Sequence, residues 1–154
     1  MKKKLRLALL ILILIFIAIQ FAPSKLPENL PAQTEQNMQV QNAGPEIMAI
    51  LKTSCFDCHS NQTVYRWYAH VVPVSWLIAR DVSKGRAALN FSEWNTYNKR
   101  KLVRKLGDIK EQIAKKEMPI RIYSLMHPNT KLNPAQMLLL TDWTDQETKK
   151  IMGQ

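Results

Sequence analysis

The sequence predicts a small all-α domain preceded by one apolar N-terminal helix. Apolar residues recur at helical spacing, helix-starting residues precede several of these runs, and no convincing stretch alternates apolar and polar residues as a half-buried strand does. The chain has 154 residues, which is enough for one domain of ordinary size. With 4 Gly and 8 Pro it is neither a collagen-like nor a Gly-rich low-complexity chain.

Residues 1–22 predict a signal anchor or transmembrane helix. The cationic start MKKKLR precedes an uninterrupted apolar run over 7–19. The positions 5–22 span roughly 27 Å as a helix, close to the thickness of a thin hydrocarbon core. A cleaved signal peptide is the alternative, although Gln20 occupies a place where cleavage requires a small residue. Because cations stay in the cytoplasm, we expect a single-pass protein whose domain lies on the periplasmic side of the cytoplasmic membrane.

Residues 23–43 predict a flexible tether, because Pro23, Pro27 and Pro31 stand among many Gln and Asn without helical or strand periodicity. The alternative is an ordered loop packed on the domain. The domain itself is expected over 44–154.

Two helices are expected in the first half of the domain. Pro45 suits the first turn of a helix that runs into Cys55. Ser75 is a plausible N-cap for a second helix that ends near Ala88.

Two more helices are expected in the second half. Ser92 caps a long helix whose apolar residues follow steps of 4, 3 and 4, and Met118-Pro119 ends it. Asn133-Pro134 combines an N-cap with a first-turn proline and starts a last helix through Trp143.

One motif contains both cysteines of the chain and one of its three histidines: Cys55-Phe56-Asp57-Cys58-His59. C-x-x-C-H is the attachment signature of haem c. The two thiols bond the two vinyl groups at one porphyrin edge, and the adjacent imidazole binds the iron as the proximal ligand. The motif therefore predicts one covalently bound haem c, with Cys55 and Cys58 as thioether sites and His59 as an iron ligand.

Three other interpretations of the cysteines stay open. A thioredoxin-like redox pair needs a preceding strand in a βαβ unit, which the sequence lacks. A structural zinc site needs four ligands, and this motif supplies at most three. A disulfide between the two cysteines closes only a very small loop and stabilises little.

A sixth iron ligand is expected from Met or His elsewhere in the domain. Met118 is favoured, because it stands before Pro119 directly after the predicted long helix and lies far enough from His59 to reach the other haem face. His127, His70 and an open sixth position are the alternatives.

Aromatic and basic residues allow two interpretations each. Tyr65, Trp67, Tyr68 and Trp76 pack on the porphyrin and bond its propionates, or they are ordinary core residues. Arg66 pairs with a propionate or is solvated. The chain carries 22 Lys and Arg against 12 Asp and Glu; its basic stretch over 99–116 is a solvated face or a docking surface for an acidic redox partner or anionic lipid. We expect no nucleic-acid partner outside the membrane.

Taken together, the motifs resemble the small bacterial haem-binding domain family of cytochrome c type. Besides C-x-x-C-H, the resemblance rests on the segments 73–76 (PVSW), 90–94 (NFSEW) and 117–119 (EMP) and on the His127-Pro128 pair. It covers nearly all of 44–145 and implies a cytochrome c-like fold behind a single anchor. It also implies that Cys55 and Cys58 hold the haem, with His59 proximal and Met118 distal. The chain lacks the Gly-Pro that usually follows the haem motif of small cytochromes c.

These observations predict a membrane-anchored monohaem electron carrier that is not an enzyme. A haem-based sensor or peroxidase-like enzyme with an open sixth position is the second hypothesis, and a zinc-binding structural module is the third.

Overall fold

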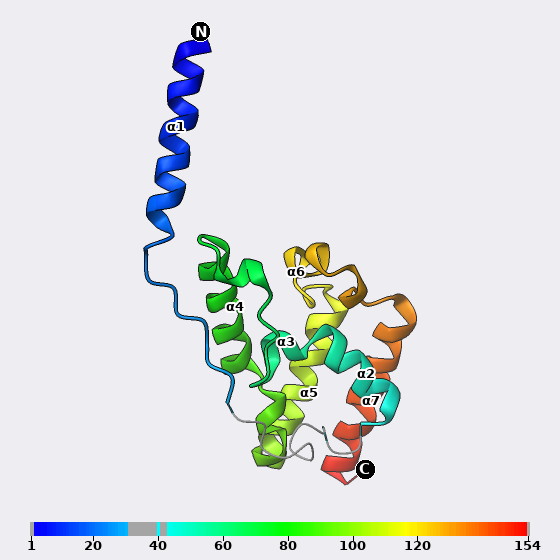
Figure 1. Ribbon diagram of the computed structural model, residues 1–154. Coiled ribbons are helices and arrows are strands. Elements are labelled where there is room, and N and C mark those ends of the chain that lie inside the picture. The colour runs from blue at the N-terminus through cyan, green and yellow to red at the C-terminus, as the bar shows by residue number, and fades with distance from the viewer. Residues whose placement is uncertain (1, 31–39, 41–42, 154) are drawn as a thin grey trace.

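The computed structural model describes residues 2–30, 40 and 43–153. Every regular element in these residues is a helix, so the all-α prediction is confirmed (Figure 1). The α-helices are α1 (Lys2–Ile19), α2 (Pro45–Ser54), α3 (Phe56–His59), α4 (Val74–Ala88), α5 (Lys99–Ala114), α6 (Arg121–Met126) and α7 (Pro134–Met152). Three 3₁₀ helices join them: η2 (Trp67–His70), η3 (Phe91–Thr96) and η4 (Pro128–Thr130).

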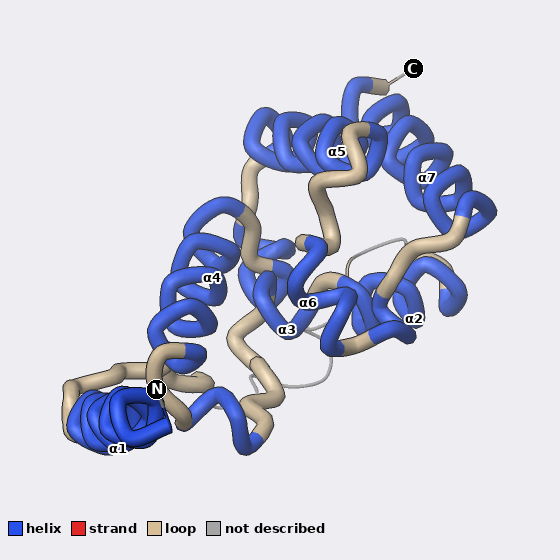
Figure 2. The backbone as a smooth tube through the Cα atoms, turned by 90° about the horizontal axis from the view of Figure 1, so that it is seen from above, coloured by secondary structure: helices blue, strands red, loops and turns tan. Residues whose placement is uncertain are grey.

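The hydrophobic core lies where α2, α5 and α7 meet. Leu51, Leu106 and Leu140, one from each helix, are fully buried. The ring of Phe91 stacks on Phe56 at a centroid distance of 5.1 Å, which extends this core to α3. Figure 2 shows α3 and α6 in the middle of the helices α4, α5, α7 and α2. The motif helix α3 packs against α4, α2 and η3.

Two predicted helix starts are wrong. Ser92 does not cap the long helix. Asn90 caps the short helix η3, and α5 begins at Lys99, where the side chain of Asn98 accepts a hydrogen bond from Lys101 N at 2.9 Å. Ser75 lies inside the first turn of α4, where it is buried, and Pro73 occupies the N-cap. In both places several residues with helix-starting chemistry stand close together, and packing selects among them.

The last helix was predicted correctly at its start. Asn133 and Gln136 form a capping box, in which each side chain accepts a hydrogen bond from the backbone N–H of the other residue. This satisfies two backbone donors that a helix N-terminus otherwise leaves unpaired. The helix then runs to Met152, well beyond Trp143.

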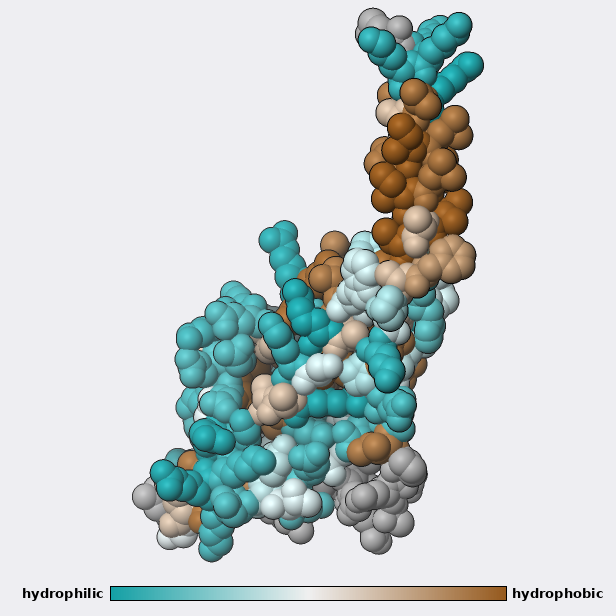
Figure 3. Space-filling view, turned by 90° about the vertical axis from the view of Figure 1, so that its left-hand side faces the viewer, coloured by the Kyte–Doolittle hydropathy of each residue, from teal (hydrophilic) through white to brown (hydrophobic). Residues whose placement is uncertain are grey.

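The N-terminal residues form the isolated helix α1, whose side chains are almost all exposed (Figure 3). Within the described residues, none of the helices combines the length and the apolar character needed to cross a bilayer, so a transmembrane helix over 1–22 is not supported. The physical reason is that four cations occupy the first turns of α1 and the uninterrupted apolar part covers only 7–19, about 20 Å of helix.

Residues 20–30 lie against the domain, and we call them the N-terminal strap. The side-chain amide of Gln20 donates to Val72 O and accepts from Val72 N, both at 3.0 Å. Asn29 exchanges a similar pair of hydrogen bonds with Thr63 at 2.8 and 2.9 Å. The described part of the predicted tether, residues 23–30, is therefore hydrogen-bonded to the domain. Residues 31–39 and 41–42 of that segment lie outside the described residues.

Candidate haem site

A break between two helices brings the motif residues together. Helix α2 ends at Cys55, whose N–H still donates to Leu51 O at 2.9 Å. The next turn starts at once, because Cys58 N and His59 N both donate to Cys55 O, at 3.2 and 3.0 Å. Cys55 and Cys58 are free cysteines, not joined by a disulfide. One helical turn therefore holds both thiols and the imidazole, and all three residues are partly buried.

The imidazole of His59 is oriented by two backbone carbonyls of α4. Its Nδ1 lies 2.9 Å from Gly85 O and 3.1 Å from Leu89 O. Both partners only accept hydrogen bonds, so Nδ1 carries the hydrogen and Nε2 keeps its lone pair. Burial lowers the pKa of His59, against a smaller opposing effect of these two hydrogen bonds. A neutral, oriented imidazole with a free Nε2 is what iron ligation requires.

Gly85 allows α4 to approach the motif this closely. A Cβ at this position would lie 2.5 Å from Cys58 O and 3.2 Å from Cys58 Cβ. Any other residue would therefore force α3 and α4 apart. The same residue gives His59 one of its two carbonyl acceptors, so the backbone of α4 serves as a template for the motif.

A cavity of about 360 Å³ opens beside His59, and we call it the His59 cavity. Cys55, His59 and Met118 line it together with the buried side chains Leu51, Phe91, Ile109 and Ile113. The side chain of Lys105 also lines this cavity.

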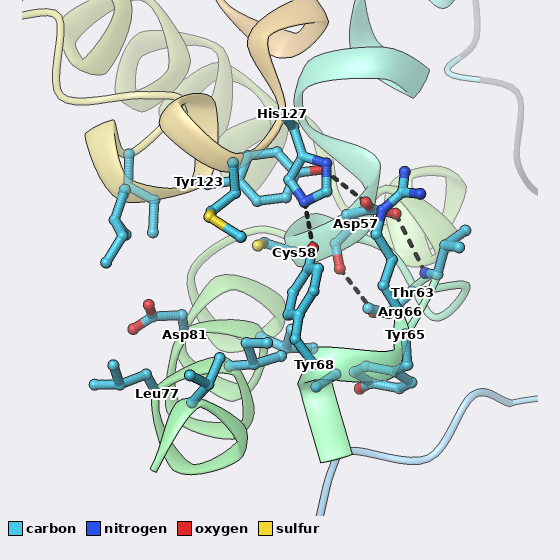
Figure 4. Close-up of a pocket in the computed structure, with 18 of the residues that line it drawn as sticks. Asp57, Cys58, Thr63, Tyr65, Arg66, Tyr68, Leu77, Asp81, Tyr123 and His127 are labelled. Carbon is cyan, nitrogen blue, oxygen red and sulfur yellow. Dashed lines mark hydrogen bonds between the residues drawn. The ribbon is translucent and has the colours of Figure 1, made fainter. Parts of the chain in front are cut away.

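A second cavity of about 310 Å³, the Cys58 cavity, is lined by Asp57 and Cys58 of the motif. Its wall is mostly apolar and includes Leu77, Val82 and Ile120. Figure 4 shows the sulfur of Cys58 directed into this space, between His127 and Asp81. The donor set of the motif and the mostly apolar lining of the two cavities fit a haem held at this motif.

The candidates for the sixth ligand are separated by this arrangement. Met118 shares a cavity with His59, and its side chain is partly exposed. His127 lines the Cys58 cavity, where its Nε2 is hydrogen-bonded to the hydroxyl of Tyr68. His70 is exposed and lines neither cavity. Of the three, only Met118 lies in the same cavity as the imidazole.

Two of the aromatic residues near the motif donate hydrogen bonds to backbone carbonyls of the N-terminal strap. The hydroxyl of Tyr65 donates to Pro27 O at 2.6 Å, and the indole N–H of Trp76 donates to Pro23 O at 3.4 Å. Trp67 is exposed. Tyr65 and Trp76 therefore hold the N-terminal strap. Arg66 is exposed at the edge of the Cys58 cavity.

Burial dominates the electrostatics of the thiols. It raises the pKa of Cys55 to about 12 and, with the nearby carboxylates of Asp57 and Asp81, the pKa of Cys58 to about 11. Both groups are thiols at neutral pH in the folded, haem-free chain. A thiol is a far weaker nucleophile than a thiolate.

The sequence did not predict several residues that contact the motif. Tyr123 donates a hydrogen bond to Asp57 Oδ2 at 2.6 Å and so connects α6 to the motif. The carbonyl acceptors of His59 carry no side-chain signature. Gly85 alone had a readable signal, because a glycine inside a helical pattern often marks a close contact.

The described residues contain no group of three or more His, Cys, Asp and Glu side chains that could hold a metal ion, so the zinc alternative finds no ligand set there. Searches of curated proteins and of solved structures found no match. The family model described as haem-binding domain matches residues 14–146, well over half of the sequence. This match includes the motif, both cavities and the N-terminal strap, and the chain belongs to the haem-binding domain family.

Proposed function

We propose that the protein holds one haem c covalently and transfers single electrons. The observation that carries this proposal is the state of His59: its Nδ1–H is bonded to Gly85 O and Leu89 O, while its Nε2 remains free in a cavity shared with Cys55 and Met118. The family supplies haem as the ligand, and the C-x-x-C-H spacing supplies the covalent attachment.

Each residue of the site has a separate role in this proposal. Cys55 and Cys58 would hold the porphyrin through thioethers, and His59 Nε2 and Met118 would bind the iron. When bound, the haem supplies an iron that alternates between the ferrous and ferric states. The apolar walls would limit the access of water to the iron. A thioether ligand such as Met118 raises the reduction potential. We assign no catalytic residue.

Spectroscopy of Met118→Ala tests the ligation. We expect the unmodified protein, produced with haem-attachment machinery, to show a low-spin c-type spectrum with a sulfur-to-iron band that disappears in Met118→Ala. Met126→Ala is the matched control, because Met126 lines the Cys58 cavity instead and should leave this band unchanged. A band that survives in Met118→Ala moves the sixth ligand to another residue. A high-spin spectrum of the unmodified protein favours a haem-based sensor or a peroxidase-like enzyme.

The proposal extends to location and partners. The basic and apolar N-terminal helix has the pattern of an export signal, which supports a haem domain outside the cytoplasmic membrane that is attached to it through this segment. The cations of α5 support docking of an acidic redox partner. Fractionation of cells that express the full chain tests the location. Recovery in the soluble cytoplasmic fraction would refute it.

A further inference from the structure

Lys105 differs from its neighbours on α5 in its burial. Only 12% of its side chain is exposed, whereas Lys110 and Lys115 expose 47% and 53% of theirs. Of these three lysines, Lys105 alone lines the His59 cavity.

The ammonium group of Lys105 is poorly paired for such a covered position. Its ion-pair partner among the described residues is Asp108, at 3.5 Å, and the Asp108 side chain is 54% exposed. The pairs Lys110–Asp145 at 2.7 Å and Lys115–Glu111 at 2.5 Å are much shorter. An ammonium offers three donors, and removing it from water is costly unless a carboxylate or other acceptors meet them. Lys105 therefore has spare capacity for an anion that enters the cavity.

We propose that Lys105 binds a propionate carboxylate of the haem; this inference rests on the proposed function. Thioethers to Cys55 and Cys58 engage the vinyl-bearing edge of a porphyrin. Its two carboxylates are carried on the opposite edge, so elements other than α3 must neutralise them. Helix α5 supplies part of the wall of the cavity, and Lys105 is the one lysine or arginine side chain among the described residues that line it. The carboxylates of Asp108 and Glu111 also line this cavity, and Glu111 is neutralised by its ion pair with Lys115 at 2.5 Å.

The other nearby cations are less suitable for this role. The guanidinium of Arg86 already donates to Ser60 O, Glu28 O and the side chains of Asn29 and Thr63. Arg80 is paired with Asp81 at 2.7 Å, and its side chain is 55% exposed. Neither cation lines the His59 cavity.

The test compares Lys105→Met, Lys105→Arg and Lys110→Met in the haem-loaded protein. Methionine keeps an apolar stem without the charge, arginine keeps the charge, and Lys110 is the control from the solvated side of the same helix. The readouts are covalent haem content by mass spectrometry, midpoint potential, and the redox-difference infrared bands of haem labelled with ¹³C in its propionates.

We expect Lys105→Met to lower the midpoint potential, because losing a nearby positive charge favours ferric iron, and to shift the labelled carboxylate bands. We expect Lys105→Arg to restore both values and Lys110→Met to change neither. Unshifted carboxylate bands in Lys105→Met with normal haem content would overturn this inference and leave the proposed function intact. Absence of covalent haem from the unmodified protein would instead refute the proposed function itself.

Discussion

Replacing Gly85 by alanine tests whether the contact between α4 and the motif determines the site. The new Cβ would lie 2.5 Å from Cys58 O, roughly 1 Å inside ordinary carbon–oxygen contact. The obstacle is backbone on both sides, so no flexible side chain can move away. Helix α4 has to shift, which disturbs the 2.9 Å hydrogen bond between His59 Nδ1 and Gly85 O.

The magnitude follows from a comparison with Gly107, a second glycine inside a helix. A Cβ at Gly107 meets nothing within 4 Å. Alanine should therefore stabilise that position by about 0.5–1 kcal/mol through its greater helix propensity. Gly85→Ala gains the same propensity but adds an overpacking cost of about 1–3 kcal/mol. The difference between the two variants isolates the contact and corresponds to roughly 2–12 °C in Tm for a chain of this length.

Thermal unfolding of both variants, followed by circular dichroism, measures this difference. We also expect the haem-loaded Gly85→Ala protein to show a weakened or lost sulfur-to-iron band, because the His59 ring is displaced, while Gly107→Ala keeps the normal spectrum. Equal stabilisation by the two substitutions, with identical spectra, would refute the idea that Gly85 sets the position of the motif.

Three further predictions concern the reactivity of Cys58, the pH dependence of stability and the N-terminal strap. Burial raises the pKa of Cys58 from 9.0 to about 11. In the haem-free protein at pH 7, Cys58 should therefore be alkylated roughly 100 times more slowly than an unstructured cysteine, and the alkylation rate should rise about tenfold per pH unit. A rate that stops rising below pH 9 would contradict this prediction. The pKa of His59 is lowered, so near and below pH 6.5 the folded state binds fewer protons than the unfolded state. The free energy of unfolding, measured in urea, should therefore fall between pH 7 and pH 5 by up to about 1.4 kcal/mol per pH unit. The fall should be smaller in His59→Asn, and an equal fall in both proteins would contradict this prediction. Arg86→Ala removes four hydrogen bonds and should lower the free energy of unfolding by about 1–3 kcal/mol. It should also speed proteolytic cleavage within residues 20–30, whereas Lys84→Ala, at an exposed position, should change neither value. Unchanged resistance of Arg86→Ala to proteolysis would refute the role of Arg86 in holding the N-terminal strap.

The sequence predicted those parts of the fold that depend on local chemistry. Asn133-Pro134 starts α7 because capping and the fixed proline backbone act over four residues, so no distant contact is needed. The start of α5 was misplaced because Ser92 and Asn98 offer similar capping chemistry. Which of them starts the long helix depends on the burial of Phe91 and Trp94 in the core, which only the folded chain reveals.

The candidate site divides in the same way. The C-x-x-C-H motif is contiguous, so one helical turn brings its three side chains together wherever the helix lies. Met118 could be singled out only by its place before a proline, and the structure puts it in the cavity with His59; its ligation of iron stays a prediction. The carbonyl acceptors of His59 could not be predicted, because backbone oxygens have no sequence signature. The burial of Lys105 could not be predicted either, because a buried lysine and an exposed lysine cannot be distinguished in the sequence.

The N-terminal strap limits how far the domain can travel from α1. A freely flexible chain of about 20 residues has a root-mean-square span of about 25 Å and would let the domain sweep a wide volume. The paired hydrogen bonds of Gln20 with Val72, and of Asn29 with Thr63, instead join α1 to the domain over a short, fixed connection. A surface that binds α1 would therefore also fix the distance of both cavities from that surface and their orientation. In the proposed electron transfer, the partner has to reach the cavities at that distance.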